Sequence, residues 1–407
     1  MYALADRLRR ELADGVERIC VVTWTGGRLG HAADLPAGAD APTRAAGLGV
    51  SGLVKTVAKE WPQRSVRRID LDPQEPTAAH AAALLPELLD PSGPSEVGHH
   101  AGQRLGRRFA PHELVAPDPT ALEAADSLAL DEQAVVLLTG GARGITARVA
   151  VVLAERYRCR LVLVGRSPAP AAAEAPAWAD AHTDADLRAA ILARGEARAP
   201  AEVERKLRRI KAERQMRETF ASVRAAGSPL EYHAADVRDA DAVRELMDDV
   251  YRRYGRLDVV LHGAGVNEDK LLRDKTRESF LRVYDTKVAG AHNLVRGLRA
   301  DTRAVVFFSS VAGAFGNRGQ ADYAAANDAL DDLARTLDGS ITARVVSIGW
   351  GPWGGGGMVT PELERQYHQR GVGVIDPVDG VERLLNELTA GEHPQVVLMA
   401  AMPESMV

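Results

Sequence analysis

The pattern of hydrophobic and polar positions predicts a first α/β segment near the start of the chain. Apolar residues recur at helical spacing over residues 4–15, 42–61 and 78–89. Short runs typical of strands lie between and after them, at residues 17–24, 66–71 and 104–109. Strands that alternate with helices favour a mostly parallel sheet covered by helices.

A second and longer α/β segment begins at residue 134. Apolar runs predict further strands at residues 134–139, 160–165, 230–235, 257–261, 304–309 and 343–348, with helices between them. This order is typical of a doubly wound parallel sheet. We therefore expect two α/β units, residues 1–115 and 134–407. Residues 116–133 are rich in Pro, Asp and Ala, lack periodicity, and are predicted to be a linker.

One segment of the second unit is longer than its place requires. Residues 168–226 far exceed the usual length of a strand-to-helix connection. Within them, residues 201–224 carry an apolar stripe among many Lys and Arg residues. Glutamates interleave with these cations, so a solvated amphipathic helix is favoured over a nucleic-acid contact.

Composition and charge exclude several classes of function. The 407 residues are 46% hydrophobic and 26% charged, with a net charge of −5. This balance indicates no attraction to nucleic acid or to an anionic membrane. The apolar runs are too short to span a bilayer, and no signal peptide is evident. Cys20 and Cys159 lie in strand-like runs and are expected to be buried free thiols in a reducing cytoplasm; no metal site is expected.

A glycine-rich turn follows the first strand of the second unit. Glycines there let the backbone approach a pyrophosphate, which then lies at the N-terminus of the next helix. The candidate cofactor residues of this turn are Thr139, Gly140, Gly141, Arg143, Gly144 and Ile145. A tight structural turn is the alternative. Residues 25–30 have the same spacing, but residues 31–43 are rich in Pro, Gly and Asp and cannot open a helix, so no nucleotide is predicted there.

The next strand ends in Gly165-Arg166-Ser167. The residues at this position indicate whether the cofactor is NAD or NADP. An acidic residue at this place would hold the ribose 2′-hydroxyl of NAD. Arg166 instead favours the 2′-phosphate of NADP, because a guanidinium is a planar and permanently charged donor. A solvent-facing arginine without this role is the alternative.

The strongest chemical cluster lies between Lys287 and Asn327. Ser310 ends a predicted strand, and Tyr323 follows on a helix with Asn327 one turn later. With the glycine turn, this set resembles the short-chain dehydrogenase/reductase superfamily. Most members carry lysine four residues after the tyrosine; here Asn327 stands there and Lys287 lies upstream. That exchange resembles the ketoreductase domains of polyketide synthases and related fatty-acid synthases.

The resemblance covers nearly the whole chain and implies two Rossmann-like subdomains. The first would be truncated and structural, without cofactor, and the second would bind NADPH. It implies a substrate lid at residues 354–370. The sequences of residues 139–147, 268–276 and 316–322 are most similar to those of ketoreductases from enediyne and polyunsaturated-fatty-acid synthases. These synthases are iterative. Further cofactor contacts implied by the resemblance are Ser167, Asp236, Val237, Gly263, Ala264, Gly265, Gly351 and Pro352.

The resemblance also assigns chemical roles. Tyr323 would donate a proton to a β-carbonyl oxygen and Ser310 a hydrogen bond. The ammonium of Lys287 would favour the phenolate, and Asn327 would hold the lysine or a relay water. The implied substrate is a β-ketoacyl chain on the phosphopantetheine arm of an acyl carrier protein.

The resemblance bears on stereochemistry as well. Family members that form D-hydroxyl products carry Leu-Asp-Asp where this chain has Asn267-Glu268-Asp269, so only Asp269 is retained. Members that form L products carry tryptophan where Phe315 stands. We predict a D-β-hydroxyl product, with Trp353 and Met358 as further residues at the substrate.

Three interpretations of the whole chain remain open at this point. The first is a ketoreductase domain excised from a larger synthase, with neighbouring synthase domains as partners. The second is a free-standing reductase of small ketones, which the first subdomain argues against. The third is a catalytically silent scaffold that holds cofactor and organises its neighbours, which the intact set around Tyr323 argues against.

Overall fold

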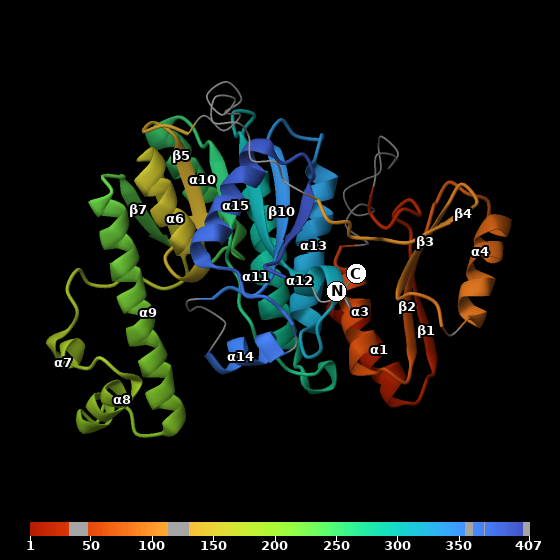
Figure 1. The fold of residues 1–407 in the computed structure, drawn as a ribbon, viewed down its shortest axis with the longest axis horizontal. Helices are drawn as coiled ribbons and strands as arrows, with labels where there is room; N and C mark the ends of the chain where they lie inside the picture. The colour runs from red at the N-terminus through yellow and green to blue at the C-terminus, as the bar shows by residue number, and fades with distance from the viewer. Residues whose placement is uncertain (32–47, 91, 113–129, 355–360, 370, 402–407) are drawn as a thin grey trace.

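The computed structural model describes residues 1–31, 48–90, 92–112, 130–354, 361–369 and 371–401. It contains two sheets, each covered by helices, which lie side by side along the long axis of the molecule (Figure 1). The strands within each sheet are mostly parallel. The predicted α/β class with Rossmann-like parallel sheets is therefore confirmed.

The larger sheet has seven parallel strands in the order β11-β10-β9-β8-β5-β6-β7. Chain order reverses between β5 and β8, which makes a crevice at the carboxyl ends of these two strands. Most of the strands are buried on both faces, which explains their continuous apolar runs. The bounds are β5 Val135–Thr139, β6 Arg160–Gly165, β7 Leu230–Ala234, β8 Val259–His262, β9 Ala304–Ser310, β10 Arg344–Trp350 and β11 Gln395–Leu398.

Helices cover both faces of this sheet. One face packs against α6 (Gly144–Tyr157), α9 (Pro200–Ala225) and α15 (Pro377–Ala390). The other packs against α10 (Ala240–Tyr254), α11 (Arg277–Arg296) and α13 (Ala321–Leu337). Three short elements join them near the crevice: the 3-10 helix η1 (Leu272–Asp274), α12 (Val311–Phe315) and α14 (Pro361–Gln369).

The smaller sheet has the order β1-β2-β3-β4, with only β4 antiparallel. Its elements are α1 (Tyr2–Ala13), β1 (Arg18–Thr23), α3 (Val50–Glu60), β2 (Ser65–Leu71), α4 (Thr77–Leu89), β3 (Glu96–His100) and β4 (Gln103–Leu105). In Figure 1, α3 lies between this sheet and α13 of the larger unit.

Two expectations for the smaller unit are corrected, and one of its strands is missed by the sequence pattern. Gly49 has a φ of 78°, so α3 starts after it, at Val50; residues 42–47 of the predicted helix lie outside the described residues. The strand β3 is not predicted by the sequence pattern, because Glu96 and two histidines hide it. The closing strand expected at 104–109 is only Gln103–Leu105, and Phe109 instead contacts the ring of Phe315.

The long insertion forms a small helical unit at one end of the molecule (Figure 1). The predicted helix is confirmed as α9, whose apolar stripe is buried at both ends. Its first half packs against α8 (Asp184–Ala193) and α7 (Pro176–Ala179), which the pattern does not predict because their sequences are short and alanine-rich. Its second half packs on the larger sheet through Met216, Phe220 and Val223.

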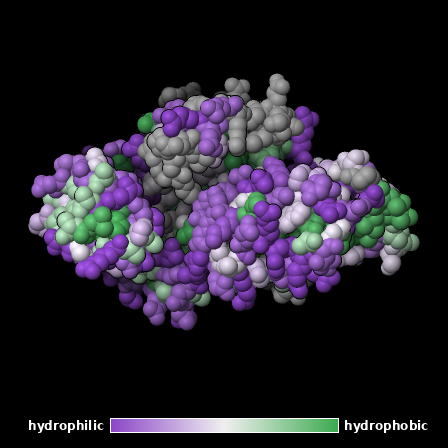
Figure 2. Space-filling view, turned by 90° about the horizontal axis from the view of Figure 1, so that it is seen from below, coloured by the Kyte–Doolittle hydropathy of each residue, from purple (hydrophilic) through white to green (hydrophobic). Residues whose placement is uncertain are grey.

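The surface and the cysteines add a few simple features. Figure 2 shows hydrophobic side chains gathered at the end formed by α4, where Leu85, Leu88 and Leu89 are exposed. Cys159 is buried and free, but Cys20 is only partly buried, because it lies beneath α4, whose residues are themselves largely exposed. No helix in the described part of the chain is long and apolar enough to cross a membrane. Most of the predicted linker, from 116 to 129, lies outside the described residues.

Candidate functional site

Three neighbouring strands of the larger sheet end at the same crevice. Thr139 ends β5, His262 ends β8 and Ser310 ends β9. Parallel strands place their carboxyl ends at one edge of a sheet, which is where ligands of doubly wound folds bind. The topology therefore brings the glycine turn and the Ser310 region together, although they are far apart in sequence.

Tyr323 lies near the start of α13 and is 9% exposed. Burial raises the pKa of its hydroxyl, while hydrogen bonds with the side chains of Ser310 and Asn327 lower it; the net direction is upward. The neutral phenol form of Tyr323 is therefore favoured. Ser310 caps α12, since its hydroxyl oxygen accepts from the backbone N–H of Ala312 at 3.2 Å.

Lys287 lies deeper, on α11, and is almost fully buried. Its ammonium donates to the carbonyl oxygen of Phe308 at 2.6 Å and lies 5.8 Å from the ring centre of Tyr323. Burial lowers the pKa of Lys287 to about 8, against a smaller opposing effect of Asp331. A cation this close to the tyrosine ring favours the phenolate form, which burial alone would disfavour.

Asn327 follows Tyr323 by one turn of α13 and is fully buried. Its amide nitrogen donates to the backbone oxygen of Tyr323 at 2.8 Å. Its side-chain oxygen is buried and makes no hydrogen bond within the described part of the chain. Buried acceptors normally have a partner, so this oxygen fits a water or a lysine ammonium at the site.

His262 is not among the candidates from sequence, although a histidine that ends a strand beside Gly263 is a detectable signal. Its two ring nitrogens lie 2.8 Å from the Thr139 hydroxyl and 2.9 Å from the backbone oxygen of Lys287. Burial lowers the pKa of His262 to about 3, so the ring is neutral. Nε2 must donate to the carbonyl, and Nδ1 then accepts from Thr139. The histidine links the glycine turn to the helix that carries Lys287.

The glycine turn has the geometry of a phosphate cradle. Gly140 and Gly144 have φ values of 72° and 63°, which side chains disfavour. A Cβ on Gly140 would lie 3.0 Å from the oxygen of Gly263, and one on Gly141 would lie 2.8 Å from Leu138 Cβ. Gly144 opens α6, whose first N–H groups have no partners within the helix, so an anion fits there. Arg143 is exposed and Ile145 partly buried at the same turn.

Arg166 and Ser167 are exposed just after β6. The hydroxyl of Tyr232 donates to the backbone oxygen of Ser167 at 2.5 Å and so holds this corner. Asp236 is already engaged by Arg238 at 2.6 Å, which lowers the pKa of Asp236. This corner therefore presents a cation, Arg166, beside a carboxylate that is already paired.

Other predicted cofactor contacts line the crevice from several sides. Val237 is buried, and its backbone oxygen accepts from Asn293 at 2.9 Å. Gly263, Ala264 and Gly265 follow β8, with the N–H of Ala264 donating to Thr139 Oγ1 at 3.2 Å. A Cβ on Gly265 would lie 3.2 Å from Cε of Lys287.

The segment after β10 is also predicted to border the cofactor and substrate. Gly351 donates to the backbone oxygen of Leu398 at 2.8 Å, and Pro352 accepts from the N–H of Ile375 at 2.7 Å. Trp353 is 4% exposed and packs in the hydrophobic core, with its ring 4.8 Å from that of Trp350. Met358 and most of the 354–360 stretch lie outside the described residues; the rest of the predicted lid includes α14.

Two loops frame the mouth of the site beside Tyr323. Asp269 accepts two hydrogen bonds from the side chain of Gln320, at 3.0 and 3.1 Å. The N–H of Lys270 donates to the backbone oxygen of Gly319 at 2.9 Å. The negative charge of Asp269 contributes to the upward shift in the pKa of Tyr323. Gln320 is not predicted from sequence.

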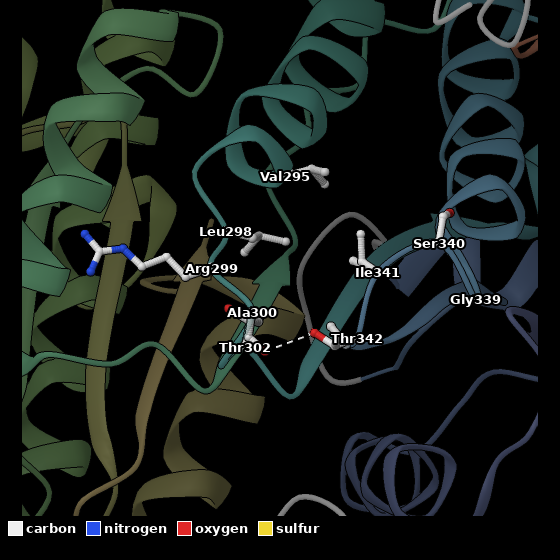
Figure 3. A pocket seen from close by; sticks show the side chains of 10 residues that line it. Val295, Leu298, Arg299, Ala300, Thr302, Gly339, Ser340, Ile341 and Thr342 are labelled. Carbon is white, nitrogen blue, oxygen red and sulfur yellow. Dashed lines mark hydrogen bonds between the residues drawn. The ribbon is translucent and has the colours of Figure 1, made fainter. Parts of the chain in front are cut away.

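A separate pocket lies at the opposite edge of the sheet (Figure 3). It is formed by the end of α11, the loop between α11 and β9 and the loop before β10, where Thr342 donates to the backbone oxygen of Ala300 at 3.0 Å. Its lining mixes aliphatic and polar residues and includes none of the predicted site residues. Within the described ranges, no group of three or more His, Cys, Asp or Glu residues is arranged to hold a metal.

Comparison with known proteins identifies the family of this chain. A family model described as the KR domain matches residues 134–355. One subunit of the polyunsaturated fatty acid synthase of Thraustochytrium sp. is 32% identical over 390 residues, which is 92% of this chain and 13% of that protein. The erythronolide synthase EryA3 of Saccharopolyspora erythraea is 32% identical over 344 residues, which is 84% of this chain and 9% of that protein. The chain thus spans only a small part of these relatives.

Solved structures show the same fold. The first ketoreductase of the tylosin polyketide synthase has 27% identity and a TM-score of 0.70, covering 98% of this chain and 73% of that one. A ketoreductase from the first module of phoslactomycin biosynthesis in Streptomyces sp. HK803 has 25% identity and a TM-score of 0.70, covering 98% and 79%. The chain belongs to the KR-domain family, the ketoreductase domains of polyketide and polyunsaturated fatty acid synthases with the short-chain dehydrogenase/reductase fold.

Proposed function

We propose that this domain uses NADPH to reduce a β-ketoacyl thioester, carried on an acyl carrier protein, to the D-β-hydroxyacyl thioester within an iterative synthase. The observation that carries the proposal is the constellation around Tyr323. Its protonated hydroxyl interacts with Ser310 and Asn327, and the buried ammonium of Lys287 lies 5.8 Å from the centre of its ring.

The chain's own residues fit the nicotinamide cofactor. Gly140 and Gly144, which adopt positive φ values without strain, leave a cradle at the N-terminus of α6 for a pyrophosphate. Arg166 presents a guanidinium suited to a 2′-phosphate, while the carboxylate of Asp236 is occupied by Arg238. When bound, NADPH supplies the hydride that reduces the carbonyl carbon.

The protein residues supply the proton and stabilise the oxygen. Tyr323 donates its phenolic proton to the carbonyl oxygen, and Ser310 donates a hydrogen bond to that oxygen as negative charge develops. The tyrosine is left as a phenolate, which the ammonium of Lys287 stabilises. Asn327 holds a water or the lysine through its unpaired oxygen, so that a proton returns to Tyr323 from solvent.

Support for the acyl-carrier substrate and the iterative synthase comes from the relatives. A polyunsaturated fatty acid synthase matches 92% of the chain, and polyketide synthases match most of it. Both kinds of enzyme build acyl chains, so a neighbouring acyl carrier protein is the natural donor of the ketone. We include in this proposal the similarity of residues 139–147, 268–276 and 316–322 to ketoreductases of enediyne synthases.

The D product is proposed from the loop that carries Asp269. This carboxylate lies at the mouth beside Tyr323 and is held by Gln320. Phe315, which stands where L-forming members carry tryptophan, is turned toward Phe109. An acidic group on one side of the entrance would favour one orientation of the thioester over the other.

The test is NADPH consumption with a β-ketoacyl thioester mimic, followed by chiral analysis of the product. Wild type should turn over and form mainly the D-hydroxyl. Tyr323→Phe should lower kcat by at least about 100-fold, because the proton donor is lost while the ring is kept. A wild-type domain that binds NADPH but reduces nothing would instead be a silent scaffold. A mainly L product would overturn the stereochemical part alone.

A further inference from the structure

The smaller unit contacts the catalytic loops through one helix. Its helix α3 packs directly on α12 and α13, so closely that a Cβ on Gly52 would lie 2.3 Å from the backbone oxygen of Ala324. Lys55 donates to the oxygen of Ala314 at 2.8 Å and Lys59 to that of Gly316 at 3.0 Å. The second unit's catalytic helix therefore rests on a rigid element of the first unit.

The last residue of α3, Glu60, makes the most specific of these contacts. One carboxylate oxygen accepts from the backbone N–H of Leu272 at 2.7 Å. The other accepts from the backbone N–H of Gly319 at 3.0 Å. One side chain of the first unit thus joins two separate loops of the second.

These two loops are the ones that frame the mouth beside Tyr323. They are joined to each other by the Lys270–Gly319 backbone bond and by the Gln320–Asp269 contacts. Gly319 also lies just before the helix that carries Tyr323. Lys275 also joins the Asp269 loop to this helix, since its ammonium donates to the backbone oxygen of Glu268 and to the carboxylate of Asp322, both at 2.7 Å. Glu60 adds a contact from the first unit that holds both loops at once.

We infer that Glu60 is a positioning residue that sets the product stereochemistry and substrate efficiency of this site by holding both loops from the cofactor-free unit. The inference rests on the proposed reduction. Glu60 touches neither the reacting atoms nor the predicted cofactor contacts. Its effect should therefore fall on the thioester and its orientation and leave NADPH affinity unchanged.

The test uses the whole chain and three variants. Glu60→Gln keeps the size of the side chain but has only one acceptor oxygen, so it cannot serve both N–H groups. Glu60→Ala removes both acceptors. The matched control is Glu87→Gln, which disturbs another carboxylate of the first unit, one that binds Arg67, Arg104 and His99 and touches neither loop.

The first measurement is amide hydrogen exchange without cofactor or substrate. Exchange at Leu272 or Gly319 should become about tenfold faster in Glu60→Gln, and at both in Glu60→Ala, because a charge-assisted hydrogen bond is lost. Glu87→Gln should leave both amides at their wild-type rates.

The second measurement is product chirality with kcat/KM for the thioester and the dissociation constant of NADPH. We expect kcat/KM to fall roughly tenfold and the minor stereoisomer to increase in both Glu60 variants, since small displacements of positioning groups are costly. Wild-type chirality and kcat/KM in Glu60→Gln, with a working wild-type enzyme, would overturn the inference, even if amide exchange rises. Equal losses in Glu87→Gln would overturn it too, because they would indicate general destabilisation. A wild type that reduces nothing refutes the proposed function first and this inference with it.

Discussion

Two glycine turns with the same spacing follow the first strand of each sheet, and they differ in what occupies their anion position. In the first turn, the carboxylate of Asp70 accepts from the backbone N–H of Thr25 at 2.8 Å and of Leu29 at 2.9 Å. In the second, Gly144 opens α6, and the cradle faces the crevice between β5 and β8. The first turn is filled by the protein's own anion, and the second is suited to receive one from outside.

The glycines themselves also differ in purpose. A Cβ on Gly27 would lie 1.9 Å from the backbone oxygen of His99, so that glycine lets the turn pack on β3. A Cβ on Gly140 would meet the oxygen of Gly263 at 3.0 Å, on the edge where β8 ends. One spacing thus supports internal packing in one unit and a ligand cradle in the other. The motif alone therefore does not define a nucleotide site.

The largest effect that could break this comparison is expected from Gly27→Ala. The new Cβ would overlap the backbone oxygen of His99, and the alanine would have to adopt a φ of 72°. We therefore expect a loss of about 2–5 kcal/mol in the free energy of unfolding. Urea unfolding measures this loss. NADPH affinity of the folded protein should remain at the wild-type value; a weakened affinity would mean that the first turn also contributes to the cofactor site.

Next in size is the effect of Arg166→Ala on cofactor choice. Loss of a charge-assisted hydrogen bond to the 2′-phosphate should weaken NADPH binding roughly 10- to 100-fold and leave NADH nearly unchanged. Dissociation constants for both cofactors test this. Arg28→Ala, in the first turn, is the control and should change neither dissociation constant. Equal losses of affinity for both cofactors in Arg166→Ala would show that Arg166 does not recognise the 2′-phosphate.

Gly140→Ala should have a smaller effect than Arg166→Ala on NADPH affinity. In contrast to Gly27→Ala, it should weaken cofactor binding more than it lowers the stability of the fold. The substitution strains a backbone with a φ of 72° and narrows the cradle, so NADPH should bind about tenfold more weakly. Thermal unfolding without cofactor should shift less than in Gly27→Ala. If Gly140→Ala mainly destabilises the fold, the distinction between the two turns fails.

The last effect is smallest at neutral pH and concerns the protonation of Lys287, which tests the chemical step. Burial lowers the pKa of Lys287 to about 8, so its ammonium is lost as pH rises through that value. The rate of reduction should then fall by about tenfold per pH unit above 8, because the phenolate of Tyr323 loses its stabilising charge. The residual activity of Lys287→Met should lack this alkaline limb. An unchanged limb in that variant would assign it to another group.

Much of the fold follows from patterns that are local in sequence. The strands at 134–139 and 160–165 and the helix at 201–224 are predicted nearly to their ends, because fully buried strands and apolar stripes leave clear signals. The strand β3 leaves no such signal, since Glu96 in it is buried against Lys55 at 2.6 Å. A charged residue inside a sheet is only intelligible once its partner from another element is known.

The site shows the same division. The resemblance to short-chain reductases makes Tyr323, Ser310, Lys287 and Asn327 the candidates, and the fold brings these four together. His262, Gln320 and Glu60 escape such reasoning, because each acts on a group far away in the chain. Trp353 is a sequence candidate for the substrate and lies in the core beside Trp350.

What the amino-acid sequence determined alone is the class of sheet and the presence of the glycine-rich turns, since these depend on short-range periodicity and residue type; the candidate reacting side chains follow from the resemblance to short-chain reductases. The Pro- and Gly-rich stretch 31–43 already argues against a nucleotide at the first glycine turn, but only the tertiary structure shows that Asp70 closes this turn and that the first unit reaches the catalytic loops through Glu60. Both depend on contacts between segments distant in the chain, and hydrogen bonds of 2.7–3.0 Å between such segments leave no periodic trace in the sequence.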